Sequence, residues 1–144
     1  EGLSDLYDLP AHYRTAREAL ALMGDERYHG ESVCTVDRLR VPLLLKNLEG
    51  REDLISRPLE ALADHDREKG TGYCETLYWY LACGRSLKKT CEMLFTHRNT
   101  VLYRIRRMQG DFGLPLDDPA RHAELLLGVS VLLFRDRGPD FFLR

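Results

Sequence analysis

Seven basic side chains lie close together in one short stretch of this 144-residue sequence. The stretch runs from residue 85 to residue 107 and contains a single acid, Glu92, so its net charge is +6. Guanidinium and ammonium groups bind phosphate oxygens, and arginine also donates two parallel hydrogen bonds to the edge of guanine. A basic run alone is usually a solvated helix face, so its placement on the fold decides its meaning. The basic residues are Arg85, Lys88, Lys89, Arg98, Arg104, Arg106 and Arg107.

Two short amphipathic helices are predicted across this basic stretch. Ser86 is a suitable N-cap for the first helix. The expected buried face of that helix is Leu87, Cys91 and Leu94, at helical spacing. Phe95 and Thr96 interrupt this pattern, and a second apolar face starts a few residues later. Two short helices with a tight connection are typical of a helix-turn-helix. The second face consists of Val101, Ile105, Met108 and Phe112, with Leu102 beside it.

The second helix presents polar groups opposite its apolar face. Arg98 flanks that face but lies in the first turn, the part of such a helix that usually enters the major groove. Arginine recognises guanine, and Asn99 can recognise adenine in the same bidentate way. We therefore expect base contacts from Arg98 and Asn99. Phosphate contacts are expected from Ser86, Lys88, Lys89, Thr100, Tyr103, Arg104, Arg106 and Arg107.

The sequence contains no residue pattern typical of an active site or a metal site. No G-x-S-x-G, H-E-x-x-H, G-x-x-x-x-G-K-[ST] or G-x-G-x-x-G motif occurs. The cysteines lack zinc-ligand spacing and are expected to be reduced and mostly buried. We therefore predict no enzyme, no metal and no cofactor. The cysteines are Cys34, Cys74, Cys83 and Cys91.

The composition is that of an ordinary globular protein, with 44% apolar and 31% charged residues. The total net charge of −2 combines an acidic first part, the basic stretch and a mildly acidic tail, so it does not argue against a nucleic-acid partner. The longest nearly apolar run, residues 125–134, is about half of what a membrane span needs. No basic leader with an apolar segment opens the chain. We expect a cytoplasmic protein that does not contact membranes and, since residue 1 is Glu, a fragment of a longer chain.

The rest of the chain is predicted to be mainly helical. A short strand is plausible only over residues 33–36, and Asp118 is expected to cap a helix that begins at Pro119. The predicted fold class is mainly α: a helical bundle containing a helix-turn-helix, with a small α and short β N-terminal segment. Further helices are predicted over residues 8–23, 43–48, 53–69, 73–83 and 119–135.

Two of these helices carry expectations about packing. The first should bury the face formed by Tyr13, Ala16, Leu20 and Met23. The last, residues 119–135, is apolar nearly all round, so it is either central to the core or covered by another chain. The sequence does not decide between two arrangements. One is a homodimer that forms through this helix, and the other is a monomer with this helix in its core.

The run His97-Arg98-Asn99-Thr100-Val101-Leu102-Tyr103-Arg104 resembles the C-terminal DNA-binding domain of PucR/CdaR-type bacterial transcription regulators. The flanking segments, Leu77-x-x-Tyr80-Leu81 before it and Gly113-Leu114-x-Leu116 after it, fit the same family. The resemblance implies a helix-turn-helix of the Fis type with a recognition helix at about residues 97–109. It also implies that His97 and Arg98 meet bases and that Thr100, Tyr103 and Arg104 hold phosphates. Thr96 stands where the family usually has an aliphatic residue and is expected to cap the recognition helix.

Residues 6–20 resemble the end of the degenerate GGDEF-like central domain of these regulators, and residues 64–71 resemble the junction that leads into the DNA-binding domain. No G-G-[DE]-E-F loop is present. The resemblance implies that residues 1–50 are the C-terminal remnant of that domain with its linker, and that residues 51–144 are the helix-turn-helix DNA-binding domain. Effector binding is then expected in upstream domains that this chain lacks.

These features together predict the DNA-binding output domain of a cytoplasmic bacterial transcription regulator, with double-stranded DNA as its partner. The alternative is a helical protein-interaction or dimerisation module that does not bind DNA. In that alternative Arg104, Arg106 and Arg107 only solvate a helix face.

Overall fold

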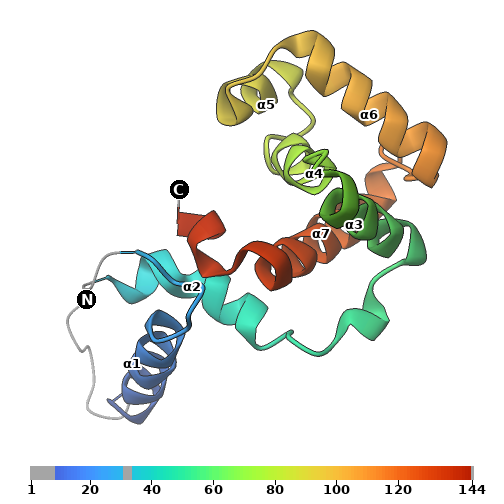
Figure 1. The fold of residues 1–144 in the computed structure, drawn as a ribbon. Coiled ribbons are helices and arrows are strands. Elements are labelled where there is room, and N and C mark those ends of the chain that lie inside the picture. The colour runs from blue at the N-terminus through green and yellow to red at the C-terminus, as the bar shows by residue number, and fades with distance from the viewer. Residues whose placement is uncertain (1–8, 31–33, 144) are drawn as a thin grey trace. The chain divides into compact units, whose positions relative to one another are not determined.

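The computed structural model describes residues 9–30 and 34–143 (Figure 1). Within these ranges the chain is helical and contains no strand, so the predicted mainly α fold class is confirmed. The α-helices are α1 (Leu9–Met23), α2 (Val36–Lys46), α3 (Arg57–Lys69), α4 (Tyr73–Ala82), α5 (Leu87–Leu94), α6 (Arg98–Phe112) and α7 (His122–Arg137). Short 3-10 helices are η2 (Glu52–Leu54), η3 (Pro119–Arg121) and η4 (Pro139–Leu143).

The short strand predicted over residues 33–36 is not found in the part of it that the structure describes. Cys34 and Thr35 have no regular structure, and Val36 is the first residue of α2. Val33 lies outside the described residues. An acid in the first turn, Asp37, favours the helix here because it faces the positive end of the helix dipole.

Helix α2 also runs through Pro42, whereas the sequence predicts a helix only after it, at residues 43–48. Proline lacks an N–H and removes one bond of the helical ladder, which usually breaks a helix. The helix continues because Leu39, Pro42 and Leu43 are all buried on one side of it. The energy of burying this apolar face outweighs the local cost of the proline.

The chain forms two compact units, one made of Glu1–Glu49 with Phe134–Arg144 and the other of Gly50–Leu133. In the first unit α1 packs against α2, and α2 packs against η4. The predicted buried face of α1 is wrong: Tyr13 and Leu20 are 66% and 68% exposed, while Ala19 and Leu22 are buried. Helix α1 carries apolar residues on more than one side, and its contact with α2 selects which side is covered.

The first unit is held together by a charged network around Arg27. Its guanidinium forms ion pairs with Asp25 at 2.7 Å and with Glu49 at 2.9 Å. It also donates hydrogen bonds of 3.3 Å to the carbonyl oxygens of Phe134 and Arg135 in the last turns of α7. The Arg135 carbonyl lies in the last turn, where the end of a helix leaves carbonyls unpaired, whereas the Phe134 carbonyl also accepts a 2.9 Å hydrogen bond from Gly138 N. The hydrogen bonds from Arg27 hold the pKa of Asp25 well below its usual range.

The second unit has its core between α3, α4, α6 and α7. Each helix contributes fully buried leucine or other apolar side chains: Leu59 and Leu62, Leu77 and Leu81, Val101 and Met108, Leu125 and Val129. Gly128 permits the close approach of α7 to α3, because a Cβ atom there would lie 2.7 Å from Leu59 Cδ1.

Helix ends in the second unit follow the signals in the sequence. Ser56 is the N-cap of α3, which ends at the left-handed Gly70. The carboxylate of Asp66 accepts hydrogen bonds from the backbone N–H groups of Tyr73 at 2.9 Å and Cys74 at 2.7 Å, so a side chain of α3 caps the start of α4. The predicted N-cap Asp118 is confirmed, since its carboxylate accepts a 2.9 Å hydrogen bond from Ala120 N at the start of η3.

Candidate nucleic-acid interface

Helices α5 and α6 form the predicted helix-turn-helix (Figure 1). The connection between them consists of Phe95, Thr96 and His97. Ser86 is the N-cap of α5, and its hydroxyl oxygen accepts a 3.4 Å hydrogen bond from Lys89 N, which confirms the predicted cap. Both helices pack against α4 as well as against each other. The core of the second unit therefore fixes the orientation of the pair.

The buried face of α6 is the one that the sequence predicts. Val101 and Met108 have no exposed surface, and Ile105 is 7% exposed. Phe112, at the end of the same face, is only partly buried. Since this face is directed into the core, the opposite side of α6 is presented to solvent.

The buried face of α5 differs from the prediction. Leu87, Cys91 and Leu94 are only partly buried, whereas Thr90 is completely buried. The Thr90 hydroxyl donates a 2.8 Å hydrogen bond to the carbonyl oxygen of Ser86, so its burial leaves no unsatisfied donor. Apolar periodicity could not identify this position, because the core residue is polar and its partner is a backbone atom.

The start of α6 is exposed. His97 is the N-cap, and Arg98 and Asn99 begin the first turn; all three side chains are exposed. The predicted cap by Thr96 is not found, and no described side chain caps the first N–H groups of α6. The three residues predicted to meet bases therefore lie together at the open end of one helix.

Four cationic side chains of α5 and α6 are exposed. Lys88 and Lys89 lie on the first turn of α5, and Arg98 and Arg106 lie on α6. None of the four forms an ion pair among the residues that the structure describes. Their charges are thus available to an anionic partner. Tyr103 is 58% exposed, while Ser86 and Thr100 are partly exposed.

Arg104 is directed away from these cations, toward α4. Its Nη1 atom donates hydrogen bonds to the Thr76 hydroxyl at 2.8 Å and to the Gly72 carbonyl oxygen at 3.4 Å. Thr76 is completely buried. The sequence contains no signal for this pairing. Thr76 and Gly72 lie 28 and 32 residues before Arg104, at the start of another helix, α4.

Arg107 is exposed but has internal partners. It forms an ion pair with Asp111 one turn later at 2.7 Å. A hydrogen bond with Tyr73 and the charge of Asp111 together raise the pKa of Arg107 above its usual value. Tyr73 in turn stacks on His65, with ring centroids 5.6 Å apart, and packs edge-on against Phe112. This aromatic cluster joins α3, α4 and the end of α6.

Arg85, the remaining basic residue of the stretch, is also bound internally. Its Nη2 atom donates a 2.9 Å hydrogen bond to the carbonyl oxygen of Asp118. The basic stretch of the sequence thus separates in the fold into exposed cations on α5 and α6 and arginines that bind the protein itself.

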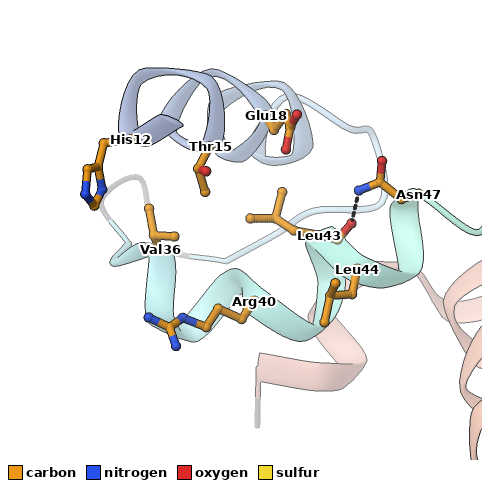
Figure 2. Close-up of a pocket in the computed structure, with 8 residues that line it drawn as sticks. All are labelled: His12, Thr15, Glu18, Val36, Arg40, Leu43, Leu44 and Asn47. Atoms are coloured by element: carbon orange, nitrogen blue, oxygen red, sulfur yellow. Dashed lines mark hydrogen bonds between the residues drawn. The ribbon is translucent and has the colours of Figure 1, made fainter. Parts of the chain in front are cut away.

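The first unit contains a groove of about 460 Å³ between α1 and α2 (Figure 2). Its side chains do not form a charged site: Arg40 pairs with Asp37 at 2.6 Å, and the Asn47 amide donates to the Leu43 carbonyl at 2.9 Å. Among the described residues no group of His, Cys, Asp or Glu could hold a metal ion. None of the described helices is long and apolar enough to cross a membrane. The groove is lined by His12, Thr15, Glu18, Val36, Arg40, Leu43, Leu44 and Asn47.

A comparison with protein families matches the part of the chain that contains α5 and α6. Residues 73–131 match the family model of the PucR C-terminal helix-turn-helix domain. The chain is 32% identical over 93 residues to the purine catabolism regulatory protein of Bacillus subtilis (strain 168). That match covers 63% of this chain and 17% of the length of the relative. No solved structure gives a significant match.

Proposed function

We propose that this chain, whose residues 73–131 match the PucR C-terminal helix-turn-helix family model, is the DNA-binding output part of a transcription regulator. The observation that carries the proposal is the exposure of His97, Arg98 and Asn99 at the start of α6, together with exposed cations on α5 and α6 that form no ion pair among the described residues. This is the end of a recognition helix that enters the major groove in proteins of this kind.

Base recognition is assigned to the three residues at the start of α6. Arg98 can bind guanine O6 and N7, and Asn99 can bind adenine N6 and N7. The imidazole of His97 offers one donor and one acceptor to a neighbouring base edge. All three belong to the N-cap and first turn of α6, the end of such a helix that enters the major groove.

Phosphate binding is assigned to other side chains of α5 and α6 and to the N-cap Ser86. Lys88, Lys89 and Arg106 supply charges that are not engaged within the protein. The hydroxyl groups of Ser86, Thr100 and Tyr103 and the guanidinium of Arg107 would complete the set. Arg104 would contact a phosphate only through the Nε and Nη2 donors, since its Nη1 atom is bound to Thr76 and Gly72.

The experiment is selection of bound duplexes from a random DNA pool by the 144-residue chain. We expect recovery of a defined sequence. The binding constant for that sequence should fall steeply with salt, because phosphate-bound counterions are released on binding. Selection of no sequence, together with binding that is indifferent to salt, would contradict the proposal and favour a protein-interaction module.

The structure bears on the proposed homodimer, which was suggested by the apolar helix at the end of the chain. Within the chain, α7 buries Val129, Leu132 and Phe134, whereas Leu127 is 55% exposed. Burial against its own chain thus accounts for most of the apolar character of α7. We retain a dimer on DNA as a proposal, because one helix-turn-helix reads only a short half-site. A selected sequence with two half-sites about one helical turn apart would support it, and a single half-site would contradict it.

We also propose that residues 1–50 are the end of a preceding GGDEF-like domain, that an effector binds further upstream, and that the regulator acts in the cytoplasm. The relative from Bacillus subtilis is several times longer than the segment it shares with this chain, which leaves room for such domains. Limited proteolysis of the chain should then cleave first near residue 50. Uniform degradation would contradict this boundary.

A further inference from the structure

Phe95 adopts a backbone conformation that is unfavourable for its residue type. It is the C-cap of α5, with φ 49° and ψ 42°, in the left-handed region. In this region the Cβ atom crowds the carbonyl oxygen that follows, so glycine and asparagine are the usual residues. The turn itself needs only backbone atoms: Thr96 N donates a 3.1 Å hydrogen bond to the Cys91 carbonyl. A glycine would therefore form the same turn with less strain.

The ring of Phe95 makes almost no contact within the chain. It is 97% exposed, more than any other large apolar side chain among the described residues. Arg85, the other non-glycine residue with positive φ in the described ranges, differs because its side chain binds the carbonyl of Asp118. The strain at Arg85 is thus offset by a side-chain hydrogen bond, whereas the Phe95 side chain has no comparable contact among the described residues to offset its strain.

The position of Phe95 indicates which partner could offset it. Phe95 stands two residues before His97, so its Cα lies within about 7.6 Å of the start of the base-reading turn. Met93, two residues before Phe95, is 40% exposed and apolar, but the exposed side chains that follow Phe95, His97, Arg98 and Asn99, are polar or cationic and do not extend an apolar patch for a protein partner. A surface of this kind suits DNA, whose major groove offers one apolar group to side chains, the 5-methyl of thymine.

We propose that the Phe95 ring packs against a thymine 5-methyl group next to the base pairs read by α6, and so determines specificity at that position. The inference rests on the proposed DNA binding. The contact needs no movement of the helices, because the ring already projects from the turn.

The test compares Phe95→Gly, Phe95→Asn and Phe95→Leu in the 144-residue chain. The probes are the duplex selected by the unsubstituted protein and the same duplex with deoxyuridine for each thymidine in turn. Gly and Asn fit the left-handed conformation without a ring, so both variants should resist urea at least as well as the parent. Both should bind the thymine duplex about fourfold more weakly, the value of one buried methyl group. Phe95→Leu keeps an apolar side chain and should retain most of the affinity.

Deoxyuridine at one position should weaken binding of the parent by a similar factor and leave Phe95→Gly unaffected. If Phe95→Gly binds more weakly than the parent by the same factor on the thymine duplex and on the uracil duplex, the assignment to thymine is overturned. Unchanged affinity of Phe95→Gly would overturn the inference while salt-dependent binding by the parent still supports the proposed function. If the parent binds no duplex at all, the proposed function fails first.

Discussion

The Nη1 atom of Arg104 lies 2.8 Å from the hydroxyl oxygen of Thr76, which joins the recognition helix α6 to the start of α4. The Thr76 hydroxyl itself donates a 2.7 Å hydrogen bond to the Gly72 carbonyl oxygen, which also accepts from Arg104. Thr76 is completely buried, so each of these partners depends on the others for its hydrogen bonds. The orientation of α6 is thus held by a polar contact in addition to its apolar face.

Removal of this contact should destabilise the fold. Arg104→Ala leaves the Thr76 hydroxyl and the Gly72 carbonyl with fewer partners, and Thr76→Val removes the acceptor of Arg104 without a change of shape. Each should lower the free energy of unfolding by about 1–3 kcal/mol, as for a buried hydrogen-bond partner that is lost. Urea denaturation measures the effect. Arg106→Ala is the matched control on α6 and should change stability by less than about 0.5 kcal/mol. Equal stability of all three variants would show that the Arg104–Thr76 bond does not hold α6.

Arg106 should contribute to DNA affinity through its charge alone. It is exposed and has no ion-pair partner among the described residues. Arg106→Ala should weaken binding to specific and random duplexes alike and reduce the slope of log K against log salt by about 0.9. Titrations over a range of salt concentrations measure the slope. Arg57→Ala, an exposed arginine at the start of α3, is the control and should leave the slope unchanged. If both variants reduce the slope equally, DNA affinity depends on the net charge of the chain and not on the position of Arg106.

Arg98 and Asn99 should determine sequence preference. Loss of a bidentate base contact costs about 1–3 kcal/mol of discrimination, so Arg98→Ala and Asn99→Ala should lose affinity mainly for the selected sequence. Competition between selected and random duplexes measures the ratio. Lys89→Ala is the matched control, since it should lower affinity for both duplexes equally. Unchanged preference in Arg98→Ala would contradict its base contact.

The first unit should lose stability in acid through Asp25. Arg27 lowers the pKa of this carboxyl below its ordinary value of 3.8, so the ionised form is bound more tightly in the folded chain. Its contribution is therefore complete above the unfolded pKa and is lost as the pH falls toward the folded pKa. Asp25→Asn should be less stable than the parent at neutral pH, and the difference should narrow below about pH 4.

Urea unfolding followed by circular dichroism at several pH values tests this expectation. Asp64→Asn is the control, because its pair with Arg67 is exposed on both sides and worth little. A difference between the parent and Asp25→Asn that stays constant from neutral to acid pH would contradict the coupling of Asp25 to Arg27.

Much of the helix-turn-helix follows from the sequence. Ser86 as N-cap, Asp118 as N-cap and the core face Val101, Ile105 and Met108 are all present as predicted. These features depend on residues within about four positions of each other, which is the range over which helix geometry alone decides. The contacts with DNA stay a prediction, since exposure shows only that the side chains are accessible.

Tertiary structure decided the features that depend on distant partners. Two apolar sides of α1 compete, and contact with α2 buries Ala19 and Leu22 and leaves Leu20 exposed. Helix α2 passes through Pro42 because a buried apolar face compensates the missing hydrogen bond.

The basic stretch also separates what the sequence determines from what only the fold decides, here for the functional residues. The sequence by itself determined that seven cations lie between residues 85 and 107, on two short helices. Only the fold decided that Arg104 and Arg85 bind the protein while Lys88, Lys89, Arg98 and Arg106 are exposed. A helical wheel gives the direction in which a side chain leaves its own helix. It does not contain the carbonyl and hydroxyl groups of neighbouring elements, and these groups determine where a long arginine side chain ends.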